Sequence, residues 1–390
     1  MKKNRDLFAV NKTCNVRKIL LTATFLLSTV ITVMGSTKIH LVDNDTRELL
    51  ILASILDKEG KVVALTGTDG EIPELSPKSF PVTFTYIGYE PLEIKKMPEN
   101  DIALTPKALE LSEVTVTPGS HPLLHLTGYM REYASSFGSS DSLTIYHESI
   151  VDFMIPIEDT KIKGWRKPRI LAENNYMRHT DSKGLDSVTD KVDDLYLWAS
   201  YARIFPSSKY SIKLPSDVAG VSGSVSKTVI NKDKTRTNWQ KNGDMIRLNH
   251  DVMPRYKNHT YSPGVFKLLG ATINITEATG SYVFINSDGD NQLRPRELSR
   301  ISRSMKMTGR GKMWKWAADS KAPVDMKSYI EIYVTDMEYL TEAEAKDLKK
   351  NPPAVSCNQI VAPAGAPALH PGIQNIVRRV KGLTPKGISF

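Results

Sequence analysis

The chain has 390 residues, of which 40% are hydrophobic, and a formal net charge of +9 at neutral pH. This apolar content is sufficient for real cores and excludes a wholly disordered chain, and the length fits two domains with peripheral segments. The positive charge is compatible with nucleic acid, an acidic glycan or an anionic membrane surface, and composition alone does not choose among them.

Residues 1–35 have the three parts of a secretory signal peptide. Six basic residues come first, an uncharged stretch follows over residues 19–34, and Gly35 supplies the small residue at the exit. An uncleaved anchor helix is the alternative, but the uncharged stretch is shorter than the ~20 apolar residues that a membrane span needs. The pattern predicts export to the periplasm or the outer-membrane periphery. Cleavage would remove Cys14 and leave Cys357 without an internal disulfide partner.

Residues 36–118 are predicted to form a β-sandwich of short strands. Apolar runs and a segment of period two are separated by turn sequences such as DKEG and TDG. The candidate strands lie at residues 39–42, 49–56, 61–65, 82–87, 102–104 and 114–116.

Four motifs in this segment resemble those of the carboxypeptidase-regulatory-like domain found in Bacteroidetes envelope proteins. Residues 84–90 (FTYIGYE) match its aromatic strand, and residues 111–116 (LSEVTV) match its closing segment. Two weaker matches are TRE at 46–48 and TDGEI at 68–72, with Leu49 and Ile72 in place of the usual proline and aromatic residue. The resemblance implies a transthyretin-like sandwich, a non-catalytic module that precedes other domains.

Residues 119–350 are predicted to form a larger α+β domain with a mainly antiparallel sheet. A hairpin is expected from strands at 128–137 and 143–153 around the turn GSSD. Further strands are predicted at 169–178, 265–275, 282–285 after a turn at Gly280, and 329–334, with helices at 193–205 and 341–350. The order resembles a twisted half-barrel that follows such sandwiches, and the predicted fold is therefore mostly β.

Residues 351–390 form a Pro/Ala-rich tail that is expected to be extended at first. Ile373, Ile376, Val377 and Val380 then recur at helical spacing, which predicts a short helix that docks on the domain. A helix lying on a membrane is the alternative.

Residues 286–297 match a calcium-binding loop of the EF-hand type at several positions. Asn286, Asp288, Asp290 and Glu297 would supply the hard oxygen ligands that calcium prefers. Two features oppose this prediction: Asn291 stands where the loop normally has glycine, and a strand is predicted before the loop. A calcium site and an ordinary hairpin turn both stay open, and no other cofactor is expected.

Two basic tracts contain tryptophan, which is typical of surfaces that bind polyanions. The first tract consists of Lys227, Lys232, Lys234, Arg236, Lys241 and Arg247, with Trp239 inside it. The second consists of Arg294, Arg296, Arg300, Arg303, Lys306, Arg310, Lys312 and Lys315, with Trp314 and Trp316 nearby. Because an exported protein rarely meets nucleic acid, the expected partners are an envelope protein, an anionic glycan or a lipid surface. A solvated cationic surface is the alternative.

The sequence contains no recognisable nucleophile motif, paired carboxylates or histidine cluster, although catalytic residues can be distant in sequence. The preferred interpretation is a non-enzymatic binding or scaffolding protein of the cell envelope. Two alternatives remain. One is a glycan-acting hydrolase or transferase, and the other is a lipid or lipoprotein carrier with a cavity in the half-barrel.

Overall fold

The computed structural model describes residues 38–107, 121–193, 196–198, 202–207, 209–286, 288–314 and 322–383. The predicted signal peptide (residues 1–35) and the closing sandwich motif (residues 111–116) lie outside the described residues. His40–Phe390 fall into one compact unit by their contacts, so the predicted boundary between sandwich and sheet domain stays a prediction. No described helix is long and apolar enough to cross a bilayer.

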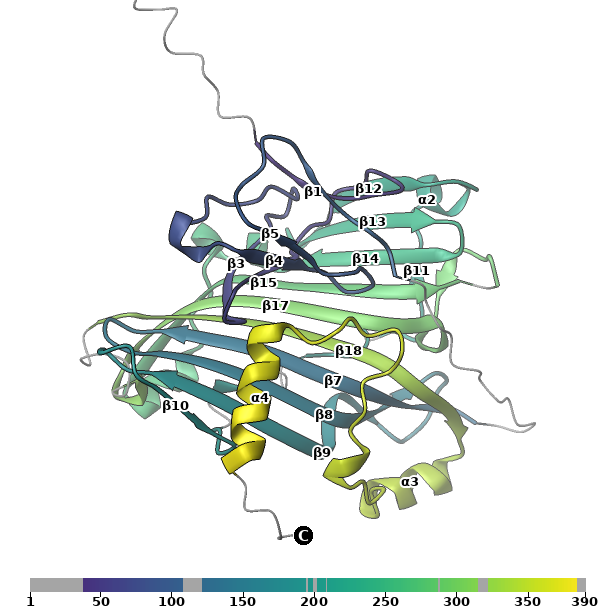
Figure 1. Ribbon diagram of the computed structural model, residues 1–390. Helices are drawn as coiled ribbons and strands as arrows, with labels where there is room; N and C mark the ends of the chain where they lie inside the picture. The colour runs from purple at the N-terminus through teal and green to yellow at the C-terminus, as the bar shows by residue number, and fades with distance from the viewer. Residues whose placement is uncertain are drawn as a thin grey trace, which may run out of the picture. The chain divides into compact units, whose positions relative to one another are not determined.

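A ten-stranded antiparallel sheet dominates the fold, in the order β10-β9-β8-β7-β18-β17-β15-β14-β13-β12 (Figure 1). Its strands are β7 (Leu123–Phe137), β8 (Ser142–Pro156), β9 (Trp165–Thr180), β10 (Asp186–Thr189), β12 (Val225–Ile230), β13 (Arg236–Asn242), β14 (Met245–Asp251), β15 (Ala271–Ile285), β17 (Leu298–Gly311) and β18 (Val324–Leu340). The predicted hairpin is the β7–β8 pair, and β10 and β12 form the open edges. The prediction of a mostly β fold with a mainly antiparallel sheet is confirmed.

Strand alternation gives this sheet two faces of different chemistry. Along β7, Tyr129, Arg131 and Tyr133 point to one side, whereas Leu126 and Met130 point to the other. The strand register mostly places tyrosines opposite tyrosines and apolar residues opposite apolar residues on neighbouring strands, so each face is continuous. The side that we call the tyrosine face carries Tyr129, Arg131, Tyr133, Tyr146, Tyr176, Tyr329, Glu331 and Tyr333. The opposite side is called the apolar face, and it carries Leu126, Met130, Phe153, Leu248, Tyr282, Ile301 and Ile332.

The chain itself covers the apolar face. Ile204, Phe205, Leu214 and Val218 pack into the cluster, and the Phe205 and Phe284 rings meet edge to face with centroids 6.0 Å apart. A second cluster, at the other end of this face, contains Trp198, Ile273, Met305, Met307, Trp314 and Met326. The carrier alternative needs an apolar cavity in the half-barrel, whereas the described residues of this face pack into two side-chain clusters.

Residues 40–107, which we call the N-terminal module, contain two small sheets. β1 (Leu41–Asp43) pairs in parallel with β6 (Ile102–Leu104). The other sheet has the order β3-β2-β4-β5. Its strands are β2 (Ser54–Asp57), β3 (Val62–Leu65), β4 (Val82–Thr85) and β5 (Leu92–Ile94). The module contacts the tyrosine side of the large sheet: the Val62 amide donates to Ser135 Oγ at 3.0 Å, and Tyr86 donates to Asn249 at 3.4 Å.

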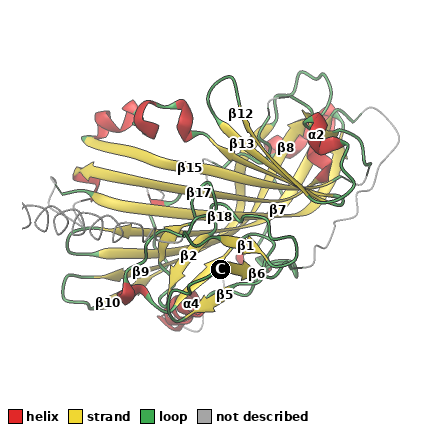
Figure 2. Cartoon of the chain, turned by 90° about the horizontal axis from the view of Figure 1, so that it is seen from above, coloured by secondary structure: helices red, strands yellow, loops and turns green. Residues whose placement is uncertain are grey.

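Two helices in the C-terminal part form where the sequence predicts them. α3 (Glu342–Lys350) begins with the predicted capping box of Thr341 and Glu344. α4 (Pro371–Leu383) buries Ile373, Ile376 and Val380 in one cluster with Leu56 and Val62 of the module and tyrosines of the large sheet. The prediction of a docking helix is confirmed, and Figures 1 and 2 show α4 on the same side of the sheet as the module.

Four predicted elements differ from the structure. The run at 49–56 forms a strand only at Ser54–Asp57, because the backbone turns at Leu52 with a φ of 65°. The strand predicted at 265–275 is divided: η6 (Gly264–Leu269) ends at a left-handed Gly270, and β15 starts after it. Gly280, predicted to be a turn, lies inside β15, where it pairs with His250 of β14 and Arg303 of β17. Of the helix predicted at 193–205, residues 202–205 are not helical.

Candidate functional site

The predicted calcium loop connects β15 to β17 and contains β16 (Gln292–Leu293) and η7 (Pro295–Glu297). The Asn286 amide closes the loop, because its oxygen accepts from the Gly289 amide at 3.0 Å and its nitrogen donates to the Asp290 carbonyl at 2.8 Å. Asp290 Oδ1 accepts from the Gln292 amide at 2.9 Å. Two of the predicted ligands therefore have a structural role in the turn.

Two guanidinium groups lie among the carboxylates of this loop. Arg294 contacts Asp290 at 2.6 Å and Asp288 at 3.5 Å, and Arg296 pairs with the same Asp288 oxygen. The hydrogen bond from Arg294 lowers the pKa of Asp290 below its ordinary value. The positive charge in this loop is thus supplied by the chain's own arginines.

Glu297, the predicted bidentate ligand, is buried beneath the loop. Its Oε2 accepts from the Arg294 amide at 2.6 Å, and burial raises its pKa although that hydrogen bond opposes the shift. Its Oε1 is buried without a hydrogen-bond partner. Across the described ranges, no group of three or more His, Cys, Asp or Glu residues could hold a metal ion. The structure brings the four predicted residues into one loop, and calcium binding stays a prediction.

A pocket of about 430 Å³ lies beside this loop, and we call it the end pocket because it lies where β7 begins and β18 finishes. Gln292, Arg294 and Arg296 line it from the loop, and Tyr339 lines it from β18. Of the remaining lining residues, His121, Glu158, Tyr210 and Ser211 are polar, and Leu124, Ile157 and Pro295 supply apolar surface. The volume falls within the range of small-molecule sites.

Short local contacts hold the polar groups of the end pocket in place. Tyr210 donates to Asp159 Oδ1 at 2.8 Å, and Ser211 donates to Gln292 Oε1 at 2.8 Å. The backbone of β11 (Ile212–Lys213) pairs with β16, which joins the segment of Tyr210 to the loop. The Tyr210 side chain remains 40% exposed, so its ring is accessible to a ligand.

The first basic tract does not form a single surface. Trp239 belongs to the core of the apolar face, and Lys227 pairs with Asp217. Arg247 is buried, and its guanidinium lies 4.6 Å from the ring centre of Tyr86. Strand alternation therefore distributes these residues between cores and solvent.

The second tract is divided in the same way along β17. Arg300 points to the tyrosine face and lies over the Tyr333 ring at 5.9 Å. Arg303 donates to the Tyr282 hydroxyl at 3.4 Å on the opposite side, and Lys306 pairs with Glu277 at 3.4 Å. Arg294 and Arg296 are the part of this tract that reaches the end pocket, and Lys315 and Trp316 lie outside the described residues.

Sequence reasoning missed a buried ion pair at the centre of the tyrosine face. Arg131 Nε contacts Glu331, whose carboxylate also accepts from Tyr329 at 2.9 Å and from Tyr333 at 3.1 Å. Arg131 Nη1 donates to the Pro367 carbonyl of the tail at 3.0 Å. A signal was present: residues 129–133 (YMREY) and 329–333 (YIEIY) place opposite charges between tyrosines at the same period of two.

A polar cluster around His125 was also missed, because its members are far apart in sequence. His125 contacts Asp152 at 2.9 Å and Glu338 at 2.7 Å, and Asp152 also pairs with Arg169. Burial alone would lower the pKa of His125, but hydrogen bonds to the two carboxylates raise it overall. Asp152 also accepts from the Trp165 indole at 3.2 Å. These contacts tie β7, β8, β9 and β18 together.

No protein-family model and no curated protein matches the chain. Among solved structures, the chain is similar to one described as lipid–protein interactions in lipovitellin, with 7% identity and a TM-score of 0.23. The match covers 57% of this chain and 26% of that chain, so it spans about a quarter of the lipovitellin chain. A similarity this low carries no inference about fold or ligand.

Proposed function

We propose that the protein is a non-enzymatic binding protein of the cell envelope that takes a saccharide in the end pocket. The observation that carries this proposal is the chemistry of the pocket wall. Guanidinium, amide, carboxylate and hydroxyl groups surround a partly exposed tyrosine ring in one cavity.

This mixture suits a sugar ring. Sugar hydroxyls both donate and accept, so they match fixed donors such as Arg296 and acceptors such as Glu158. The C–H face of a sugar is apolar and packs on an aromatic surface such as the Tyr210 ring. The contacts of Tyr210 with Asp159 and of Ser211 with Gln292 fix these groups before a ligand arrives, which reduces the ordering cost of binding.

The charge of the lining favours a saccharide with an acidic group. Two guanidinium groups, those of Arg294 and Arg296, face the pocket with one carboxylate, that of Glu158, among its described lining residues. An arginine fork can hold a carboxylate or phosphate through two hydrogen bonds. An acidic substituent would compete with Asp288 and Asp290 for these donors, so we expect moderate affinity.

The same features favour binding over the two alternatives. Hydrolysis by a paired-carboxylate mechanism needs a second carboxylate across the pocket from Glu158. Among the described lining residues, Glu158 is the one carboxylate. A carrier needs an accessible apolar cavity, whereas Ile204 and Phe205 occupy the apolar face.

The N-terminal module is assigned a role separate from that of the end pocket. We infer that residues 36–118 are a regulatory-like, non-catalytic domain, as the motifs at 84–90 and 111–116 imply. Two small sheets within residues 40–107 support this inference. The envelope location rests on residues 1–35, and an intact polypeptide recovered from the cytosol by fractionation would overturn it.

Calorimetric titration with uronic-acid oligosaccharides and their neutral counterparts tests the ligand. We expect binding of the acidic series, weakened roughly three- to tenfold by Tyr210→Ala because one ring contact is lost. Tyr261→Ala is the matched control. Tyr261 is 41% exposed, close to the 40% of Tyr210, and it lies in a different loop. Absence of heat with every saccharide, or equal effects of the two variants, would reject the proposal.

A further inference from the structure

The loop between β14 and β15 exposes large apolar side chains on one side. In η6, Val265 and Leu268 are 60% and 87% exposed. A 3₁₀ helix has three residues per turn, so these two side chains lie one above the other. Phe266 points the other way and packs against the cluster of Ile273 and Met305. Phe266 therefore fixes the turn against the sheet, and Val265 and Leu268 project from it into solvent.

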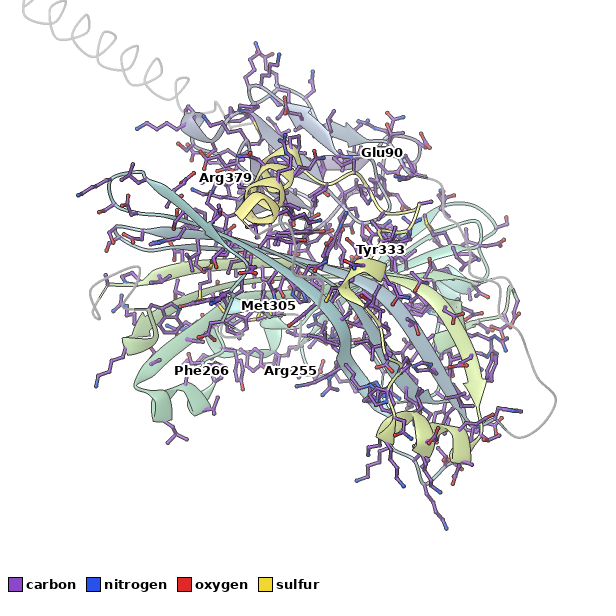
Figure 3. All side chains as sticks on the ribbon, turned by 60° about the horizontal axis from the view of Figure 1, so that its bottom comes forward. Glu90, Arg255, Phe266, Met305, Tyr333 and Arg379 are labelled. Atoms are coloured by element: carbon purple, nitrogen blue, oxygen red, sulfur yellow. The ribbon has the colours of Figure 1, made fainter. Side chains whose placement is uncertain are left out.

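Internal contacts hold the rest of this loop. Tyr261 pairs with Ile275 through two backbone hydrogen bonds of 3.0 and 2.8 Å. Its ring, 41% exposed, stacks on Tyr256 with centroids 4.6 Å apart. We call residues 256–270 the tip loop. Figure 3 shows Phe266 of this loop on the opposite side of the sheet from Glu90 and Arg379.

The surroundings of the tip loop are cationic. Residues 252–276 contain no Asp or Glu, and neither do residues 298–318. The two segments are neighbours, because Ala271 and Thr272 of β15 pair with Gly311 and Arg310 of β17. Among the described residues of this region, Lys257, Lys267, Arg310 and Lys312 are exposed cations. Arg255 and Lys306 are exposed as well, and they pair with Asp233 and Glu277.

We propose that the tip loop inserts Val265 and Leu268 into the surface of an anionic lipid bilayer. Exposed aliphatic side chains gain from the acyl boundary, a tyrosine suits the headgroup level, and lysines are attracted to anionic headgroups. The lack of acidic residues gives charge complementarity to such a surface over both segments. This inference shares only the envelope location with the proposed function, and it does not involve the end pocket.

Flotation of the full chain with lipid vesicles tests this inference. We expect the chain to float with vesicles of equal parts phosphatidylcholine and phosphatidylglycerol, more than with phosphatidylcholine alone, and less as salt is added. The double variant Val265→Ser/Leu268→Ser should lower the partition coefficient at least about tenfold, because two exposed aliphatic side chains are lost. Lys257→Gln/Lys267→Gln should reduce the preference for phosphatidylglycerol.

The matched control is Val361→Ser, which makes the same change at a side chain that is 71% exposed in the tail. It should leave flotation unchanged, and all variants should keep the thermal midpoint of the parent because the altered side chains are exposed. Flotation that the double variant does not reduce, or no flotation with either vesicle, overturns the inference. Saccharide titration of the same double variant should be normal, so failure here is distinct from failure of the end pocket.

Discussion

The two faces of the large sheet are built from alternate residues of the same strands, yet they differ in what holds them. On the apolar face, Phe153, Ile332 and Phe205 form a cluster that depends mainly on packing, and polar contacts such as that of Ser328 with the buried Glu132 lie beside it. On the tyrosine face, Arg131, Glu331 and several tyrosine hydroxyls form a buried polar network against the module and the tail. The first kind of contact is non-directional, whereas the second depends on geometry.

The difference indicates separate roles for the two faces. Apolar clusters tolerate repacking if volume is kept, so the apolar face supplies stability without fixing one arrangement. A buried ion pair contributes little net stability, but it is costly to break and can select one orientation. We therefore expect the tyrosine face to fix the positions of the N-terminal module and of the tail at Pro367.

The largest expected effect comes from breaking the polar network on one side only. Arg131→Met leaves the Glu331 carboxylate buried without its partner and should lower the free energy of unfolding by about 3–5 kcal/mol. The double variant Arg131→Met/Glu331→Leu should recover most of this loss, because neither charge of the pair is then left buried without the other. Chemical denaturation measures both, and a double variant no more stable than Arg131→Met would contradict the interpretation.

A smaller effect is expected where the tyrosine face uses apolar contacts. Ile373→Ala truncates a fully buried side chain of α4. It should lower the free energy of unfolding by an amount toward the lower end of about 2–5 kcal/mol. Ile230→Ala is the control, because Ile230 is 73% exposed and its truncation should change stability by less than about 0.5 kcal/mol. Equal losses in the two variants would show that α4 is not docked as described.

The smallest effect concerns pH. Burial raises the pKa of Glu48 from 4.5 to about 7, with Arg247 opposing the shift and Asp43 adding to it. The folded state then holds a proton that the unfolded state has lost, so this group's contribution to stability falls as pH rises from 4.5 to about 7. Glu48→Gln should gain stability relative to the parent across that window, whereas the exposed Glu99→Gln should not. Thermal midpoints measured across the window decide between these outcomes.

Local patterns in the sequence predicted much of the fold. The β7–β8 hairpin, the capping box of Thr341 and the docking helix depend on period, turn residues and caps within one segment. The failures at Leu52, Gly270 and Gly280 are positions where backbone geometry or sheet pairing overrides hydrophobic period. These effects are not encoded in the spacing of apolar residues.

The candidate site was harder to predict than the fold. The loop at 286–297 stood out by its acidic spacing, but its pairing with Arg294 and Arg296 depends on how the turn folds. Tyr210 and Glu158 reach the end pocket from segments far away in sequence, and no local pattern marks them. The Arg131–Glu331 pair was recoverable only by matching the parity of two strands about 200 residues apart in the chain.

Native-state hydrogen exchange tests most directly whether the tyrosine face makes the module and the sheet one body. The account predicts that amides of β2 and β4 in the module exchange only with the global unfolding that also opens β7 and β18. Exchange of β2 and β4 at a clearly lower free energy, with β7 and β18 still protected, would show that the module opens by itself and would contradict the account.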